Sequence, residues 1–229
     1  MKVNIFKNGR GLSDIVAQYG SSSDWLIEAS ELEDISFEIV DAYKSPHIDF
    51  RDGDAWIIMG SAKSVYDKDP WMGSLKSAIR DAIEINKPIL GICFGHQILA
   101  ECLGGSVRLN DNGWELGSVE INLTPEGVSD KLFKGFENPF SAYESHQDAI
   151  YDLPSDISVL AENSNAIQSF RTNGMQYGVQ FHPEFYYDVA LLYAKIRYDK
   201  GIIKQMPDIW NADSSKRIID NFLRIVIGE

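Results

Sequence analysis

The segment Lys87–Ala100 constrains the fold most, because it places a cysteine between two glycines where an apolar run gives way to a helical pattern. The run Pro88–Ile92 is typical of a short buried strand, and the residues from Gly95 to Leu103 are typical of a helix. On so tight a strand-to-helix turn the central residue protrudes from the end of a sheet, and the flanking positions leave no room for a side chain. The sequence therefore predicts a nucleophile elbow at Cys93.

The chemistry expected at this elbow is that of a cysteine nucleophile. The first turn of the following helix directs free N–H groups and its positive dipole end at the sulfur of Cys93, which favours the thiolate. The N–H of Phe94 is then placed to stabilise an oxyanion on an attacked carbonyl group. These five residues alone leave an alternative open, in which Gly91 and Gly95 only cap the strand and the helix. Cys102, further along the helix, is interpreted as a buried apolar residue.

Strand-like and helix-like segments alternate through the first half of the chain. This pattern predicts an α/β fold with a mostly parallel central sheet that is flanked by helices. From Gly113 to about Phe181 the segments are shorter and turn signals recur, so we expect partly antiparallel strands that close one side of the sheet. The whole chain, residues 1–229, is expected to form a single domain. Outside the elbow, the expected strands are Val3–Phe6, Ile35–Val40 and Ala55–Met59 (the last two buried), and the expected helices are Asp14–Tyr19, Asp24–Leu32, Trp71–Asn86, Val189–Lys200 and Ser214–Ile227.

A cysteine nucleophile needs a base, and the best candidate among the four histidines is His182. It ends an apolar strand-like run, which is where catalytic residues of α/β sheets tend to lie. Residues i and i+2 of an extended chain point to the same side, so Glu184 can accept a hydrogen bond from the imidazole and fix its tautomer. Pro183 keeps the chain extended between them. We expect His47 to lie on the surface and His96 to be structural.

Two segments, Gly91–Gln97 and Val179–Glu184, resemble the signature segments of the class I (triad-type) glutamine amidotransferases, in the same order and roughly ninety residues apart. The resemblance is greatest to the glutaminase part of GMP synthase and its stand-alone relatives, and it implies a flavodoxin-like fold. The run Ile57–Val65 is similar to the family's oxyanion loop. Ser61 and Ala62 stand there in place of the family's second glycine and its proline.

The resemblance also implies a mechanism. Cys93, His182 and Glu184 would form a catalytic triad that hydrolyses the side-chain amide of glutamine through a γ-glutamyl thioester. No step would need a metal or another cofactor. The oxyanion hole and the substrate site would be formed by Phe94, Gly60 and Ser61, and by Gln97, Ser145, His146 and Gln147, respectively.

Composition restricts the partners. Acidic residues number 34 and basic residues 21, for a net charge of -13, so nucleic acid is not an expected partner. No segment approaches the roughly 18 uninterrupted apolar residues that span a bilayer, and the first residues lack the pattern of a signal peptide. We therefore expect no membrane partner, a cytoplasmic location and reduced cysteines. Because the chain has no phosphate-binding loop motif, the ammonia acceptor is expected on a separate chain, as part of a synthetase subunit.

Three functions remain open. The first is a glutaminase subunit or stand-alone amidotransferase. The second is a γ-glutamyl peptide or conjugate hydrolase with the same triad, whose pocket must open on the side of the leaving group. The third is a non-catalytic binding module, against which the intact cysteine, histidine and glutamate argue. Aromatic residues that are candidates to line an open pocket are Tyr66, Trp71, Trp114, Tyr143 and Tyr186.

Overall fold

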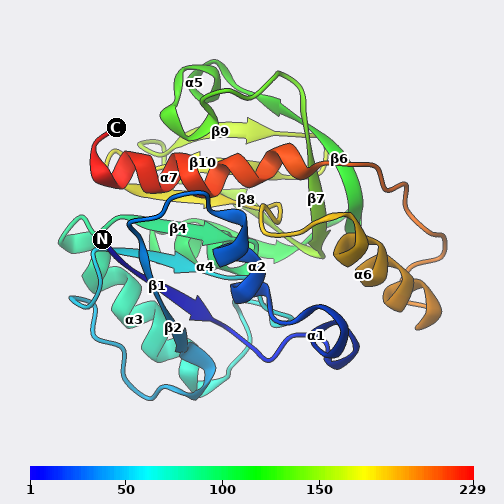
Figure 1. The fold of residues 1–229 in the computed structure, drawn as a ribbon, viewed down its shortest axis with the longest axis horizontal. Helices are drawn as coiled ribbons and strands as arrows, with labels where there is room; N and C mark the ends of the chain where they lie inside the picture. Colours follow the sequence, from blue (N-terminus) through cyan, green and yellow to red (C-terminus); the bar gives the residue numbers. More distant parts are fainter.

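A mixed nine-stranded sheet forms the centre of the computed structural model, which describes residues 1–229 (Figure 1). The strand order is β2-β1-β3-β4-β11-β10-β9-β6-β7, and β5 and β8 form a separate pair. The first five strands in that order pair in parallel and the others pair antiparallel. The strands are β1 (Lys2–Lys7), β2 (Ser36–Asp41), β3 (Ala55–Ile58), β4 (Ile89–Ile92), β5 (Ser106–Leu109), β6 (Glu115–Leu123), β7 (Phe140–His146), β8 (Asp148–Asp152), β9 (Ser158–Glu162), β10 (Ile167–Arg171) and β11 (Gln176–Val179).

Helices cover both faces of the sheet, as the alternating pattern predicts. One buried cluster joins β1, β3, β4 and β11 to the apolar stripe of α7, and a second joins the other face of β1, β3 and β4 to α3 and α4. The stripe consists of Ile218, Ile219, Phe222 and Leu223. Burial of the α7 stripe on the chain's own sheet stabilises the fold by roughly 25 cal/mol for each Å² removed from water. The helices are α1 (Ser13–Tyr19), α2 (Ser22–Ala29), α3 (Pro70–Glu84), α4 (Phe94–Cys102), α5 (Pro125–Ser129), α6 (Tyr187–Asp199) and α7 (Arg217–Ile227).

One expectation about burial is wrong. The segment Ile35–Val40 does form strand β2, but this strand lies at the edge of the sheet and pairs only with β1. Its residues Glu38 and Ile39 are exposed. An apolar run does not distinguish a central strand from an edge strand, because the number of pairing partners is set by the topology.

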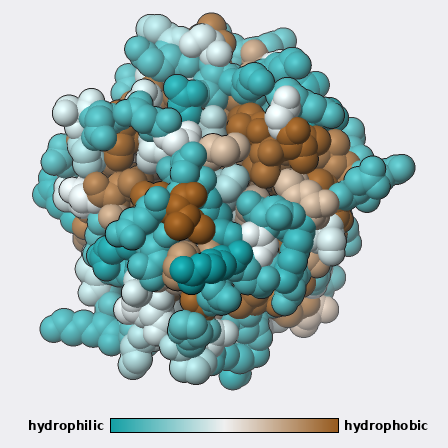
Figure 2. Space-filling view, turned by 90° about the vertical axis from the view of Figure 1, so that its left-hand side faces the viewer, coloured by the Kyte–Doolittle hydropathy of each residue, from teal (hydrophilic) through white to brown (hydrophobic).

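Both chain termini lie on one side of the molecule (Figure 1). Figure 2 views this side, where hydrophilic residues cover most of the surface and hydrophobic residues gather in separate patches. No helix of the structure combines the length and the apolar character needed to cross a membrane.

Candidate active site

The elbow expected at Cys93 is present between β4 and α4. Cys93 has a φ of 54°, a left-handed backbone conformation that is uncommon for a residue with a side chain. A Cβ atom at Gly91 would lie 2.4 Å from the carbonyl oxygen of Gly95, and a Cβ atom at Gly95 would lie 1.9 Å from the carbonyl oxygen of Ile58. Only glycine fits at these two positions, so the steric reasoning from sequence is correct. The N–H of Cys93 donates to the carbonyl of Val179 at 2.9 Å, which ties the elbow to β11.

His182 and Glu184 follow β11 and contact each other. His182 Nδ1 lies 2.8 Å from Glu184 Oε1, and both side chains are buried. The backbone N–H of His182 donates to the carbonyl of Tyr143 at 2.9 Å, and its ring stacks on Phe185 with centroids 4.1 Å apart. The imidazole is therefore held at one ring nitrogen and on one ring face, which fixes its orientation.

Gly60 lies close to both His182 and Cys93. A Cβ atom at Gly60 would lie 3.0 Å from His182 Cε1 and 3.7 Å from Cys93 Cβ, so this glycine lies against both residues. Burial lowers the pKa of His182, but the negative charges of Glu184 and Cys93 outweigh it and raise the pKa to about 10. The site therefore favours an imidazolium, which is the form that can give a proton to a leaving group.

Ser61, which stands in place of the second glycine of the family's oxyanion loop, lies in the loop after β3. The Ser61 hydroxyl donates to the carbonyl of Asn8 at 2.7 Å and accepts from the N–H of Lys63 at 3.2 Å. The Asn8 side chain in turn donates to the carbonyl of Met59 at 2.7 Å. Ser61 thus makes a bond that a glycine cannot make, and it holds the loop after β3 against the loop after β1.

Two of the predicted substrate residues, Gln97 and Ser145, border a small cavity of about 110 Å³ beside Cys93. The side-chain amide of Gln97 donates to the carbonyl of Asp148 at 2.9 Å and to Gln180 Oε1 at 3.0 Å, which leaves its carbonyl oxygen for a ligand. The Ser145 hydroxyl is buried and has no hydrogen-bond partner in the protein. Gln147 also borders this cavity.

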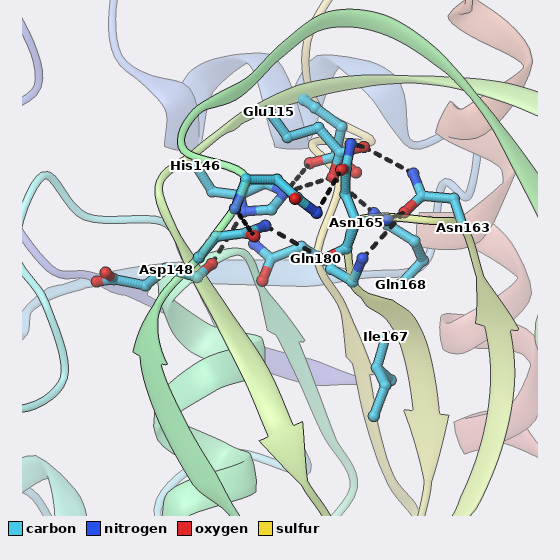
Figure 3. A network of polar contacts seen from close by, with 12 residues as sticks. Glu115, His146, Asp148, Asn163, Asn165, Ile167, Gln168 and Gln180 are labelled. Carbon is cyan, nitrogen blue, oxygen red and sulfur yellow. Dashed lines mark hydrogen bonds and ion pairs between the residues drawn. The ribbon is translucent and has the colours of Figure 1, made fainter.

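His146 borders the same cavity, but both nitrogens of its ring are engaged within the protein (Figure 3). Nδ1 lies 2.9 Å from the carbonyl oxygen of Asp148, and Nε2 lies 2.9 Å from Glu115 Oε2 and 3.2 Å from Glu144 Oε2. Oxygen atoms on both sides of the ring require two N–H groups, so the ring is an imidazolium. The ring of His146 is thus held at both nitrogens by protein atoms, between β6 and the start of β8.

Glu115, Glu144 and His146 are the group that could hold a metal ion, since their ligand atoms lie within 4.8 Å of one another. The imidazolium of His146 already supplies a positive charge between the two carboxylates. Burial lowers the pKa of His146, but Glu144 and Glu115 outweigh it and raise that pKa well above its usual range, whereas burial raises the pKa of Glu144 to about 7. The other donors to Glu115 are the side-chain amides of Asn163, Asn165 and Gln168. These contacts describe an ion-pair network, and we assign no metal to it.

Arg197 is a residue of the site that sequence reasoning missed. It lies on α6 with its guanidinium 4.5 Å from the centroid of the Trp114 ring and 5.0 Å from that of Tyr193. Tyr193 stacks on Phe185, with centroids 4.9 Å apart, so rings and guanidinium form one stack that begins at His182. The available signal was the spacing of Tyr193 and Arg197, which are one helical turn apart.

The aromatic candidates divide into two groups. Trp71 borders a larger cavity of about 460 Å³ next to Cys93, and Trp114 borders the smaller one. The other three candidates border neither cavity. These three are Tyr66, Tyr143 and Tyr186. The hydroxyl groups of Tyr66 and Tyr143 donate to carboxylates, and the ring of Tyr186 packs against Trp25.

The remaining histidines and the second cysteine have structural surroundings. His96 is buried with Nε2 at 3.1 Å from the carbonyl oxygen of Ile167, and burial lowers its pKa to about 3. His47 is exposed. Cys102 is partly buried, and burial raises the pKa of its thiol to about 12, so it is a poor nucleophile.

An elbow cysteine beside a histidine–glutamate pair, at the end of the parallel strands of an α/β sheet, is the arrangement of a cysteine-dependent amide hydrolase. A family model described as "Glutamine amidotransferase class-I" matches residues 15–190. The chain belongs to the class I glutamine amidotransferase family, a family of enzymes.

Several relatives are similar in sequence. A glutamine-hydrolyzing GMP synthase subunit of Saccharolobus solfataricus is 37% identical over 149 residues, which are 64% of this chain and 75% of that protein. Gamma-glutamyl peptidase 4 of Arabidopsis thaliana is 30% identical over 157 residues, or 67% of this chain and 62% of that protein. The glutamine-hydrolyzing GMP synthase of Pyrobaculum aerophilum is 30% identical over 76% of this chain, which spans only 32% of its length.

The fold recurs in solved structures. A glutamine amidotransferase from Thermotoga maritima superposes with a TM-score of 0.77 over 100% of this chain and 98% of that one, at 21% identity. This likeness supports the flavodoxin-like arrangement of parallel strands and flanking helices that the sequence predicts.

Proposed function

We propose that Cys93, His182 and Glu184 hydrolyse the side-chain amide of glutamine through a γ-glutamyl thioester, and that residues 1–229 form one domain for this reaction. One observation carries the proposal, namely the 2.8 Å contact between His182 Nδ1 and Glu184 Oε1 beside a cysteine on a strained elbow. That contact leaves Nε2 of the imidazole to exchange a proton with the sulfur and with the leaving group.

The reaction proceeds in two halves. The Cys93 thiolate attacks the amide carbon, and N–H groups of Phe94, Gly60 and Ser61 stabilise the oxyanion. The C–N bond breaks as His182 gives its proton to the nitrogen, which leaves as ammonia. A water molecule then gives a proton to His182 and its oxygen to the thioester carbon, the S–C bond breaks, and glutamate leaves. Glutamine and water balance glutamate and ammonia, without an oxidant or a reductant.

The γ-glutamyl group occupies the smaller cavity, beside Gln97, Ser145, His146 and Gln147. The free oxygen of Gln97 and the unpartnered hydroxyl of Ser145 suit the α-ammonium group. Arg197 borders both cavities and is in no ion pair, so its planar guanidinium suits the α-carboxylate. His146 and Gln147 contribute through the backbone of their loop.

The ammonia acceptor is proposed to lie on another chain, a synthetase subunit. The similarity to a GMP synthase subunit of Saccharolobus solfataricus supports this. A cytoplasmic location is part of the same proposal.

A second candidate function is hydrolysis of γ-glutamyl peptides by the same residues. The cavity of about 460 Å³ beside Cys93 favours it, because released ammonia needs far less space. The similarity to a gamma-glutamyl peptidase is consistent with it.

The test is release of glutamate from glutamine and from a γ-glutamyl peptide, with Cys93→Ala and Cys102→Ala as a matched pair of variants. We expect turnover that the first substitution abolishes and the second preserves. Turnover that survives Cys93→Ala, or the absence of any turnover together with no labelling of Cys93 by a glutamine-like electrophile, would overturn the proposal.

A further inference from the structure

The larger cavity next to Cys93 is too big for the leaving group of glutamine hydrolysis. Ammonia is about as large as a water molecule, whose share of the liquid is roughly 30 Å³. The cavity measures about 460 Å³, which lies in the range of pockets that hold small organic ligands. The space on this side of the sulfur therefore suits an amine that carries a substituent.

The charge of the cavity wall differs from that of the whole chain. The net charge of the protein is -13, yet the wall includes four lysine and arginine residues and only two carboxylates. One carboxylate, Glu184, is bound to His182, and the other, Asp69, lies 3.0 Å from Lys63. The cations of the wall that remain without a carboxylate partner are Lys7, Arg10 and Arg197.

Lys7 and Arg10 border only the larger cavity, whereas Arg197 borders both. Lys7 ends β1 and Arg10 lies in the loop that follows it. Asn8, which lies between them, is bound to the loop after β3 in two ways. The Ser61 hydroxyl donates to the backbone carbonyl of Asn8, and the side-chain amide of Asn8 donates to the backbone carbonyl of Met59. Lys7 and Arg10 therefore lie on a part of the cavity wall that these hydrogen bonds connect to the proposed oxyanion loop.

We propose that Lys7 and Arg10 bind a carboxylate on the amine that leaves, so that among γ-glutamyl peptides the site prefers those with a free C-terminal carboxylate. Two unpaired cations beside a cavity attract an anion, and charge-assisted hydrogen bonds to a carboxylate are stronger than neutral ones. This inference rests on the proposed function of Cys93, His182 and Glu184. It adds the chemical class of the leaving group, an amine that carries a carboxylate. The ammonia released from glutamine has no such group.

The bonds that change remain those of the amide hydrolysis. The peptide C–N bond breaks while the Sγ–C bond to Cys93 forms, and His182 gives its proton to the nitrogen of the departing amino acid or peptide. Water then provides the oxygen of the new carboxylate and returns a proton to His182, while the Sγ–C bond breaks and the Cys93 thiolate is released. The peptide and water balance glutamate and the shortened peptide.

The test compares one γ-glutamyl tripeptide as its free acid and as its C-terminal amide, which differ only in the charge that Lys7 and Arg10 would bind. We expect the native protein to prefer the acid by about tenfold in kcat/KM at low salt, and the double variant K7Q/R10Q to lose this preference. The double variant R80Q/K134Q is the matched control, since Arg80 and Lys134 are exposed, border neither cavity, and their replacement removes the same two positive charges. It should keep the preference.

The possible outcomes test the proposed carboxylate subsite separately from the proposed hydrolysis. Equal turnover of acid and amide by the native protein, or a preference that survives K7Q/R10Q, would overturn the subsite while the proposed hydrolysis stands. If the native protein turns over neither peptide, calorimetric binding to Cys93→Ala gives the same comparison without catalysis. Tighter binding of the acid would then support the subsite although the hydrolysis fails, and equal or absent binding would overturn the subsite.

Discussion

The glycine at position 95 gives the sharpest test of the elbow. In Gly95→Ala the new Cβ would lie 1.9 Å from the carbonyl oxygen of Ile58, which is about 1.5 Å inside the 3.4 Å at which ordinary contact begins. The Cβ position is fixed by the backbone of α4 and the oxygen belongs to the backbone of β3, so no side chain can rotate to relieve the clash, and α4 must move away from β3. Overpacking of this kind costs about 1–3 kcal/mol where side chains can adjust, so we expect a loss of about 3 kcal/mol or more.

Gly73→Ala is the matched control. Gly73 lies inside α3, no atom lies within 4 Å of its added Cβ, and its φ is helical, so alanine should stabilise the protein by about 0.5–1 kcal/mol. The two variants should therefore differ by about 4 kcal/mol in the free energy of unfolding. At a urea dependence of about 3 kcal/mol per M, their unfolding midpoints would lie more than about 1 M apart.

Gly60→Ala separates stability from activity. Its Cβ would lie 3.0 Å from the His182 ring, a side chain that can shift by a few tenths of an ångström, so the cost in stability should stay below about 1 kcal/mol. Displacement of His182 should nevertheless lower kcat by about 100-fold, because catalytic geometry tolerates little error. Urea unfolding followed by tryptophan fluorescence, with glutamate release on the same samples, measures both quantities. The reasoning is refuted if Gly95→Ala unfolds within about 0.5 kcal/mol of the native protein.

Three further predictions concern buried charges. Glu184→Gln should lower the pKa of His182 from about 10 and reduce kcat by roughly 100- to 10,000-fold, as followed by imidazole NMR and glutamate release; an unchanged pKa would contradict it. The folded-state pKa of His182 lies above its ordinary value of 6.5, so the stability it contributes is complete below pH 6.5 and is lost as the pH rises through 10. His182→Asn should flatten that slope in urea unfolding, and a slope that persists would assign it to another group. Glu115→Ala leaves the imidazolium and three amides without their acceptor and should cost about 3–5 kcal/mol, whereas a loss below 1 kcal/mol in urea unfolding would show that the network is not needed.

The elbow and the His182–Glu184 pair were predictable because each is encoded by neighbouring residues. Glycines at fixed offsets from Cys93 report a steric demand, and a spacing of two residues in an extended chain brings His182 and Glu184 to one side. Neither inference needs knowledge of which strands pair. The alternating apolar runs likewise predict the parallel sheet, but they do not rank its strands, so the edge position of β2 was missed.

His146 illustrates what sequence does not specify. The family resemblance implies a substrate contact for His146, yet the orientation of the ring depends on Glu115, which is 31 residues away on β6, the strand paired with β7. Arg197 was missed for a related reason. Its partners are Tyr193, one turn away on α6, and Trp114, which only the tertiary fold brings to the same place. Such contacts follow from strand register and helix docking, which a single sequence leaves undetermined.

Net charge and site charge lead to different expectations about ligands, and the two expectations are compatible. A charge of -13 disfavours a polyanion, which must approach a wide area of acidic surface. Mobile ions screen exposed charges beyond about 8 Å at physiological ionic strength, so a small anion inside a cavity responds mainly to the groups that line it. Lys7, Arg10 and Arg197 have no acidic partner there, and they make the wall of the larger cavity locally cationic. An acidic protein can therefore select anionic peptides, provided that they are small enough to bind inside the cavity, where the charges of the outer surface have little effect.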